Sequence, residues 1–273
     1  MIPDSEFPYK MLMGIFHRIK QASDERGRLV LILPRPEPDY AWLAYTLNKF
    51  RVNCRNLHTF NMDEYAVQDG NIAPETWPNS FLYNMRKNYY SKLDPPALRP
   101  PEDQILGPTN ANFGHYGKTI DDLGGADVCY GGIGWSGHIA YIEPGSAAFA
   151  APNLEEWKKI GPRIVELTPF SILQNCLGSE FGQSGDWSAI PPKEATIGPV
   201  QIVGAKLRSS WNSFMVGRSM VSWQRFTVRQ AAHGPVTPLV PASIIQMVPS
   251  ELYLSETLAA DIKPISVEEF TWY

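Results

Sequence analysis

Short apolar runs alternate with amphipathic segments along this chain, and this alternation restricts the folds that it can adopt. Residues 29–33 form a compact apolar run that predicts a buried strand, whereas residues 12–19 carry apolar side chains at helical spacing. Strands that alternate with helices predict a parallel sheet with right-handed crossovers and helices on its faces. Strands are predicted at residues 29–33, 57–61, 126–130, 213–216 and 252–254, and helices at residues 12–19, 40–50, 79–90, 118–123, 220–228 and 241–247.

Three residues are predicted to fix helix ends. Gly27 is placed to end the first helix, and Asp39 is expected to serve as the N-cap of the second. Pro241 is expected in the first turn of the helix near the C-terminus. Between residues 146 and 199 glycines and prolines break the periodicity, so we expect a long irregular segment there.

Composition excludes several classes of protein. The chain has 273 residues, of which 44% are hydrophobic and 19% charged, as expected for one large α/β domain. A net charge of −4 gives no support to nucleic-acid binding. Cys54, Cys129 and Cys176 show neither metal-ligand spacing nor a disulfide framework. The sequence shows no signal-peptide pattern and no run of about 18 apolar residues, so we expect a cytoplasmic protein without a membrane partner.

The stretch GGIGWSGHIAYIEP, residues 131–144, is the most distinctive part of the chain. It follows a predicted strand, and its glycines allow positive φ angles and a close approach of the backbone to a ligand. A histidine titrates near neutrality, and a carboxylate such as Glu143 can fix the tautomer of His138. An isolated Gly-x-Gly is more often a simple connection beside a packed histidine.

This stretch resembles the signature of the glucosamine-6-phosphate deaminase/isomerase family, Gly-Gly-x-Gly-x-Asp-Gly-His-Ile-Ala-Phe-Asn-Glu-Pro. The block TFNMDEY at residues 59–65 and the block GPVTPLVPAS at residues 234–243 also match that family. The three blocks stand in the family's order and together extend over most of the chain. One departure lies within the signature, because Ser136 stands where the family has an aspartate.

The resemblance implies an α/β fold with a single doubly wound, mostly parallel, Rossmann-like sheet flanked by helices. It implies one domain over residues 1–273, with a mobile lid at about residues 146–199. A long segment of this kind in a compact domain is also plausible as a lid on general grounds.

The family's reaction opens an amino-sugar ring, moves a proton between C2 and C1, and releases ammonia. The resemblance implies that Asp63 takes the C2 proton, that His138 is the acid and base of ring opening, and that Glu143 orients His138. It implies no metal, nucleotide or flavin cofactor. A serine at position 136 can hold a histidine tautomer but cannot stabilise an imidazolium by its charge, so we expect altered chemistry or a lower rate.

Substrate contacts are expected from the same stretch. The backbone at Gly132, Gly134 and Gly137 is a candidate binding surface, and Trp135 and Tyr141 are candidates for stacking on a sugar, although either ring is equally consistent with the core.

The resemblance fails where the family binds the sugar phosphate. The family has a Ser/Thr-Gly-Gly loop after its first strand, but residues 34–38 here read PRPEP, whose prolines supply no N–H donors. A family lysine corresponds to Met220, and a family arginine in the lid corresponds to Leu177. Either Arg35 or Arg218 could grip a phosphate by a new geometry, since a guanidinium binds phosphate bidentately.

Three functions therefore stay open. The first is an isomerase, with or without deamination, acting on a sugar that lacks the 6-phosphate or carries another group there. The second is a glucosamine-6-phosphate deaminase with a rebuilt anion site, and the third is a non-catalytic sugar-binding homologue. All three have a small-molecule sugar as partner, and a homo-oligomer is compatible with each.

Overall fold

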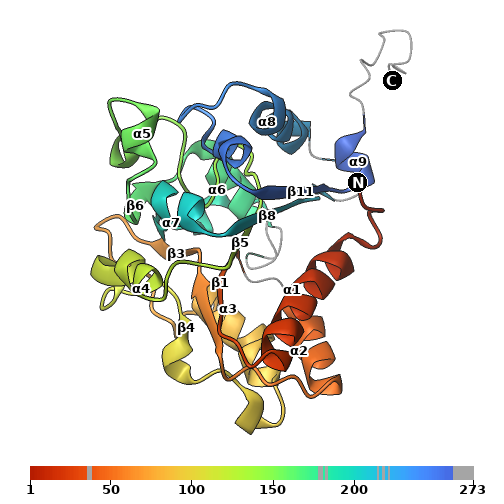
Figure 1. The fold of residues 1–273 in the computed structure, drawn as a ribbon. Helices are drawn as coiled ribbons and strands as arrows, with labels where there is room; N and C mark the ends of the chain where they lie inside the picture. Colours follow the sequence, from red (N-terminus) through yellow and green to blue (C-terminus); the bar gives the residue numbers. More distant parts are fainter. Residues whose placement is uncertain are drawn as a thin grey trace.

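A six-stranded parallel sheet forms the centre of the protein (Figure 1). The computed structural model describes residues 1–35, 39–177, 181, 184–213, 215–216, 219–220 and 222–260. The strands of the sheet are β1 (Leu29–Leu33), β2 (Leu57–Asn61), β4 (Ile105–Leu106), β5 (Val128–Gly131), β8 (Leu207–Asn212) and β11 (Ser250–Leu254). The helices are α1 (Phe7–Asp24), α2 (Tyr40–Lys49), α3 (Phe81–Asn88), α4 (Tyr116–Asp122), α5 (Leu154–Trp157), α6 (Pro169–Cys176), α7 (Pro199–Gly204), α8 (Ser222–His233) and α9 (Glu256–Ala259).

The order of the strands across the sheet is β11-β8-β5-β1-β2-β4, and every neighbouring pair is parallel. From β1 the chain adds strands first on one side and then, from β5 onward, on the other. This is the doubly wound arrangement, in which ligands bind beyond the carboxyl ends of the strands where the winding direction reverses. The predicted fold class is therefore confirmed, and the expected ligand crevice lies between β1 and β5.

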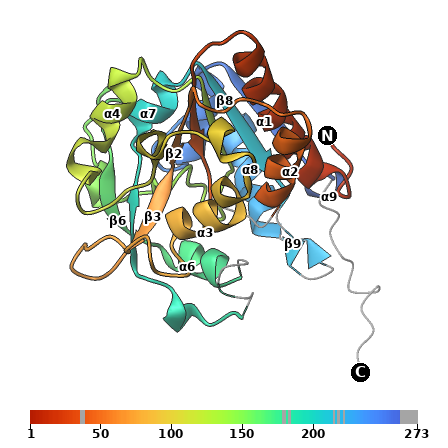
Figure 2. The same cartoon turned by 90° about the horizontal axis from the view of Figure 1, so that it is seen from below.

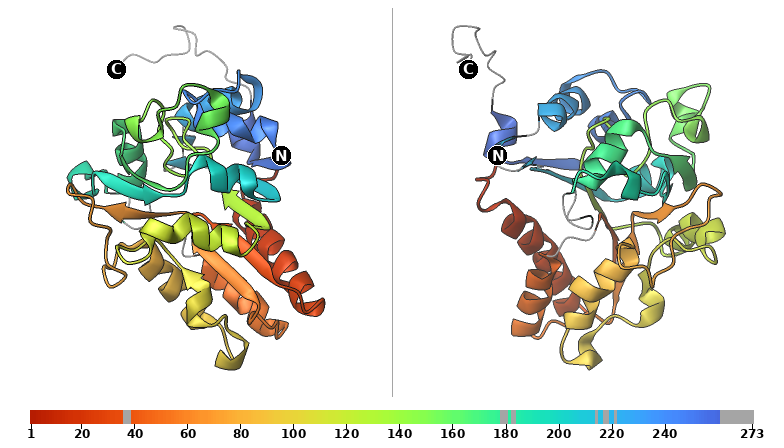
Figure 3. Two further views of the ribbon diagram at one scale, coloured as in Figure 1. Left: turned by 60° about the vertical axis from the view of Figure 1, so that its left-hand side comes forward. Right: turned by 180° about the vertical axis from the view of Figure 1, so that it is seen from behind.

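Two apolar clusters cover the two faces of the sheet. Alternate residues of β1 enter different clusters: Val30 and Ile32 pack with α4, α7 and α8, whereas Leu31 packs with α1, α2 and α3. A strand buried on both faces must be apolar throughout, which explains why β1 lies exactly at the predicted residues. Both views of Figure 3 show α1 and α2 side by side.

Strand β8 corrects the prediction of a strand at residues 213–216. The strand ends at Asn212, and residues 215–216 form β9 (Met215–Val216), paired with β10 (Ser219–Met220). The prediction was wrong because β8 is rich in polar residues. Its buried Arg208 donates hydrogen bonds to the carbonyl oxygens of Pro249 and Val203, so a polar side chain is tolerated inside the sheet.

Three helix predictions are also corrected. Asp39 precedes α2 as predicted, but its side chain makes no capping hydrogen bond. The helix predicted at residues 220–228 begins at Ser222 and extends to His233. Residues 241–247 form a 3-10 helix that does open with Pro241.

The segment 146–199 is more ordered than its glycines and prolines suggest. It contains α5, α6 and two strands, β6 (Arg163–Glu166) and β7 (Lys193–Thr196). These strands join β3 (Asp63–Ala66) in an antiparallel sheet with the order β3-β7-β6. In Figure 2 this sheet lies beside β2 of the large sheet. The expected irregular segment is thus wrong in its secondary structure, and its role as a lid stays a prediction.

Within the described part of the chain, no helix is both long and apolar enough to cross a lipid bilayer. Cys54, Cys129 and Cys176 are buried free thiols.

Candidate active site

A cavity of about 410 Å³ lies at the carboxyl ends of the central strands, where the winding direction reverses. Each strand end contributes to its lining: Arg35 follows β1, Asp63 follows β2, His138 follows β5, and Ser213 follows β8. Two side chains that are 75 positions apart in the sequence therefore line one cavity, as the catalytic hypothesis for Asp63 and His138 requires.

Two hydroxyl groups lie within hydrogen-bond distance of Nδ1 of His138. The Oγ atoms of Ser136 and Ser171 each lie 2.9 Å from His138 Nδ1. Ser136 Oγ also donates to Glu143 Oε2 at 2.9 Å, since a carboxylate can only accept. The single proton of Ser136 is thereby used, so Ser136 can only accept from Nδ1. This bond requires a proton on Nδ1 and leaves Nε2 of the neutral ring as a proton acceptor.

Glu143 acts on the histidine mainly through Ser136, because its Oε2 lies 3.7 Å from His138 Nδ1. Burial by itself would raise the pKa of Glu143. Attraction to the imidazole of His138, a hydrogen bond from Ser171 and the amide of Thr168 outweigh burial and lower that pKa to about 2. Glu143 is therefore ionised at neutral pH, and a buried anion lies one hydroxyl away from the imidazole.

A tight turn presents the histidine to the cavity. The amide of Gly137 donates to the carbonyl of Gly134 at 3.0 Å, and Gly137 has a φ of +88° that favours glycine. A Cβ atom on Gly134 would lie 1.9 Å from His138 Nε2, so any side chain there would displace the ring. The glycine at position 134 is thus required by the position of the imidazole.

The predicted substrate contacts in this turn fall into two groups. Gly132 and Gly134 line the cavity, but Trp135 and Gly137 do not. Trp135, Ser136 and Gly137 instead line a second hollow. Tyr141 does line the cavity, with its ring centroid 4.9 Å from that of His138.

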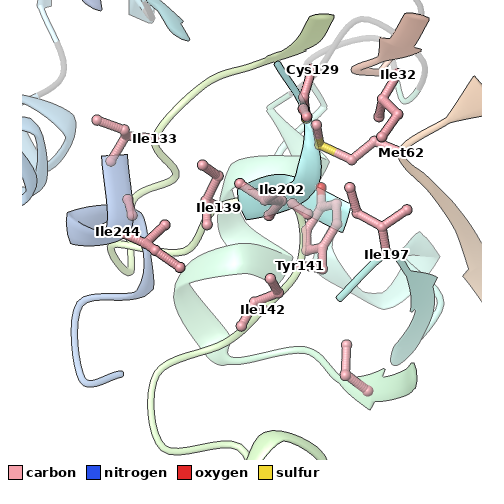
Figure 4. Close-up of a cluster of buried hydrophobic side chains, with 14 of the residues drawn as sticks. Ile32, Met62, Cys129, Ile133, Ile139, Tyr141, Ile142, Ile197, Ile202 and Ile244 are labelled. Carbon is pink, nitrogen blue, oxygen red and sulfur yellow. The ribbon is translucent and has the colours of Figure 1, made fainter. Parts of the chain in front are cut away.

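The loop that carries these residues is anchored by apolar packing. Ile139 and Ile142 belong to the same buried cluster as Ile202 of α7 and Ile244, as the close-up in Figure 4 shows. The amide of Ile133 also donates to Asn212 Oδ1 at 2.6 Å, which ties the loop to the end of β8. The histidine is therefore presented by a well-packed loop.

Asp63 is buried, with 4% of its surface exposed. Burial raises its pKa to about 7, although Thr196 and the amide of Tyr141 favour the ionised form. Thr196 Oγ1 donates to Asp63 Oδ1 at 2.5 Å and accepts from the amide of Tyr141 at 3.0 Å. Thr196 therefore links the carboxylate on β3 to the loop of His138.

The next residue, Glu64, points to the other face of β3. Its oxygens accept from the amides of Tyr65, Phe81 and Leu82 and from Ser80 Oγ, at 2.8–3.0 Å. Burial raises the pKa of Glu64 to about 7 in spite of these four donors. Three of the donors lie at the N-terminus of α3, so Glu64 anchors that helix.

A further acid, Glu194 of β7, lies opposite Tyr65 and is fully buried. Asn175 Nδ2 donates to Glu194 Oε1 at 3.1 Å, and no described residue is bonded to Oε2. Burial raises the pKa of Glu194 well above its usual value and thereby favours its neutral form. Asn175 in turn accepts from the hydroxyl of Tyr141 at 2.6 Å and from Arg35 at 3.5 Å.

Four residues of this site were missed from the sequence: Ser171, Thr196, Asn175 and Glu194. The sequence Thr168-Pro169 is a recognisable helix start, and Thr168 does cap α6. That signal places a helix but does not indicate that Ser171 meets His138. The other three offer no local signal, because their partners lie on distant elements.

The predicted loss of phosphate anchors can be followed only in part. Leu177 lines the cavity, where the resemblance would place an arginine. Met220 belongs to β10, whereas Arg218 and residues 36–38 lie outside the described residues. Arg35 is the one basic residue among the described residues that line the cavity. No cluster of three or more potential metal ligands occurs among the residues that the structure describes.

Comparison with curated proteins finds relatives over most of the chain. A glucosamine-6-phosphate deaminase from Lactobacillus helveticus is 30% identical over 209 residues, which cover 77% of this chain and 75% of the relative. A deaminase of the same name from Phocaeicola vulgatus is 29% identical over 216 residues, covering 77% and 71% of the two chains. No model of a known protein family matches the chain.

Solved structures show the same fold. A structure described as a monomeric glucosamine-6-phosphate deaminase of the NagB superfamily superposes with a TM-score of 0.72 at 22% identity, covering 92% of this chain and 95% of the other. A 6-phosphogluconolactonase from Trypanosoma cruzi gives a TM-score of 0.64 at 15% identity, with 95% and 94% covered.

Fold and cavity together define a doubly wound α/β enzyme of carbohydrate metabolism. The chain belongs to the glucosamine-6-phosphate deaminase family.

Proposed function

We propose that the protein is an aldose–ketose isomerase that acts on a sugar without a 6-phosphate, and that releases ammonia when the sugar carries an amine at C2. The observation that carries this proposal is the shared cavity of Asp63 and His138. A buried carboxyl with a pKa of about 7 and an imidazole with a free Nε2 supply the two proton-transfer groups that isomerisation needs.

In the proposed mechanism His138 opens the ring. Its Nε2 takes the proton of the C1 hydroxyl and returns it to the ring oxygen as the bond between that oxygen and C1 breaks. The Nδ1 proton stays on the side of Ser136 and Ser171, and the ionised Glu143 favours the transient positive charge through Ser136. Glu143 and Ser136 are thus positioning residues for His138.

Asp63 then moves the proton between the two carbons. Its ionised carboxylate takes the C2 proton of the open-chain aldose, which leaves an enediolate or, from an amino sugar, the corresponding enolamine anion. Transfer of the proton of the C2 hydroxyl or amine to O1, and return of the carbon-bound proton from Asp63 to C1, gives the ketose or its C2 imine. Water then hydrolyses the imine to ketose and ammonia. The relatives named glucosamine-6-phosphate deaminase support this deaminating branch.

The absence of a phosphate from the substrate is supported by the lining of the cavity. Leu177 is apolar, and Pro34 begins a loop whose prolines have no amide proton. A phosphate group is normally held by several charge-assisted donors, each contributing about 1.5–3 kcal/mol. Their loss corresponds to at least about 10³-fold in affinity for a phosphosugar.

A glucosamine-6-phosphate deaminase with a rebuilt anion site is the second candidate, and Arg35 favours it because it lines the cavity. The two candidates are separated by a panel of glucosamine, glucosamine 6-phosphate, free aldoses and ketoses, assayed for isomerisation and ammonia release. Our proposal expects turnover of free sugars and millimolar or weaker binding of glucosamine 6-phosphate by calorimetry. Micromolar binding of glucosamine 6-phosphate, abolished by Arg35→Ala, would establish the second candidate.

A further inference from the structure

The active-site cavity has an apolar region that the proposed reaction does not use. We call it the distal wall, and it comprises Phe7, Pro8, Met11 and Leu12 of α1 together with Trp211 of β8. Because α1 runs antiparallel to β1, which follows it, its first turns lie at the carboxyl edge of the sheet. The distal wall and the reactive pair therefore line one continuous cavity.

The strands separate the distal wall from the proton-abstracting group. Asp63 follows β2, and Trp211 lies on β8, which is three strands away in the order β8-β5-β1-β2. Neighbouring strands are about 4.8 Å apart, so these strands are separated by about 14 Å. This distance exceeds the width of one sugar ring. A sugar whose C1 and C2 lie between Asp63 and His138 would thus direct a substituent on its far carbon toward Trp211.

The distal wall is fixed before any substrate binds. The indole of Trp211 stacks on Tyr253, with ring centroids 4.0 Å apart and an angle of 18° between the planes. Its Nε1 donates to Ser209 Oγ at 2.8 Å, and the ring of Phe7 meets it edge-on at 5.4 Å. A rigid aromatic wall with its polar atom already bonded favours apolar groups without an ordering cost.

The charges of the lining do not favour an anion. Among the described residues that line the cavity, the acids Asp39 and Asp63 accompany the guanidinium of Arg35. A dianionic group would therefore meet no net positive charge from these described acids and the guanidinium, whereas an uncharged group would pack on the distal wall without that penalty.

We propose that the natural substrate is a sugar without a phosphate that carries an apolar group on the carbon farthest from C1, and that this group packs on the distal wall. For a hexosamine the group replaces or caps the 6-hydroxyl, and a 6-deoxy sugar is the smallest example. This inference rests on the proposed function, because it takes the reacting carbons to lie between Asp63 and His138.

Calorimetry with a graded series of ligands tests the inference. The ligands are glucosamine, 6-deoxyglucosamine, the 6-O-methyl, 6-O-ethyl and 6-O-propyl ethers of glucosamine, and glucosamine 6-phosphate. Burying a methylene group increases affinity by up to about fourfold, so the ethers should bind more tightly as they lengthen. In the variants Met11→Ser and Trp211→Ser, affinity should no longer rise as the ethers lengthen. Met13 is exposed and lies on the same helix outside the cavity, so Met13→Ser should keep the wild-type rise in affinity.

The outcomes separate this inference from the proposed function. If all the ethers and glucosamine bind equally while glucosamine 6-phosphate binds weakly, the distal wall has no role and only the inference is overturned. The inference is also overturned if the series stays steep in both distal-wall variants. If glucosamine 6-phosphate binds far more tightly than every sugar without a phosphate, the proposed function itself fails.

Discussion

Asp63 and Glu64 are adjacent carboxyls that are both buried, but they face different parts of the molecule and accept different numbers of hydrogen bonds. Burial raises the pKa of each to about 7. Glu64 faces α3 and accepts four hydrogen bonds, whereas Asp63 faces the cavity and accepts one side-chain hydrogen bond, from Thr196. The comparison teaches that burial alone does not identify a reactive acid. The number of fixed hydrogen-bond donors distinguishes the two acids, because a carboxylate surrounded by donors has no lone pair left to take a proton from a substrate.

The largest expected effect separates the two carboxyls by activity. Asp63→Asn removes the proposed base and should lower turnover by on the order of 10² or more, because general base catalysis typically contributes 10²–10⁴-fold. Glu64→Gln should keep turnover within a few-fold, since that side chain points away from the cavity. Steady-state rates on the sugar panel measure both. Equal losses of turnover in the two variants would contradict the assignment of Asp63, and not Glu64, as the base.

The free energy of unfolding should be lowered by the Glu64 substitution and not by the Asp63 substitution, which is the reverse of their effects on turnover. Asp63→Asn keeps an acceptor for Thr196 and removes a carboxyl whose ionisation burial opposes, whereas Glu64→Gln places an amide against four donors. Glu64→Gln should therefore destabilise the protein by about 1–3 kcal/mol, and Asp63→Asn should not. Urea unfolding at pH 7 measures the difference. A stable Glu64→Gln variant would show that α3 does not depend on this carboxyl.

The pH dependence of stability sharpens the same comparison. The folded pKa of Asp63, about 7, lies above its ordinary value of 3.8, so this group stabilises the fold at low pH and that stabilisation is lost as pH rises toward 7. Through this group the wild type should lose on the order of 4 kcal/mol of its free energy of unfolding between pH 4 and pH 8, and Asp63→Asn should not show that loss. The difference between variant and wild type should grow over this range in urea titrations. A constant difference would mean that the pKa of Asp63 is not raised.

The hydroxyl groups behind the histidine should have an intermediate effect on rate. Either Ser136→Ala or Ser171→Ala leaves one oxygen on His138 Nδ1, so each should lower turnover by about tenfold or less. The double variant removes both and should lose more than the product of the single effects. Ser136→Asp, which restores the family's residue, should raise turnover. Single and double variants with the same rate would show that Nδ1 needs no partner.

The smallest expected effect comes from the one hydroxyl on Asp63. Thr196→Val removes a hydrogen bond that favours the ionised carboxylate, so the pKa of Asp63 should rise further and the acidic limb of the rate profile should move to higher pH by about one unit. Activity at pH 8 should fall less than activity at pH 6. Thr196→Ser keeps the donor and provides the matched control. A profile that falls uniformly at all pH values would assign Thr196 a purely structural role.

The sequence predicted the fold better than it predicted the surroundings of the site. Strand β1 lies at the predicted residues because it is a buried, wholly apolar run. Strand β2 also lies at its predicted residues, although only Leu57 and Phe60 of it are apolar. Strand β8 was missed because its polar side chains are satisfied by carbonyl oxygens and by neighbouring side chains, which a hydrophobic pattern cannot reveal. Family resemblance indicated Asp63, His138 and Glu143, and the structure places the first two at one cavity.

What the sequence could not predict depends on contacts between distant segments. Thr196 meets Asp63 across 133 positions, and Ser171 meets His138 across 33. Neither residue has a local pattern that distinguishes it from any other buried hydroxyl. The distal wall was likewise unforeseen: the apolar residues of α1 predicted a helix face, but not that its first turn would reach the carboxyl edge of the sheet.

The most direct test of the account is the exchange of the C2 hydrogen of glucosamine with deuterated water, followed by NMR at pH 8. Wild type and Glu64→Gln should both incorporate deuterium at C2, because Asp63 removes that proton in each. Asp63→Asn should incorporate none above the uncatalysed rate while it stays folded. Exchange at the wild-type rate in Asp63→Asn would show that another group is the base and would contradict the assignment of the two carboxyls.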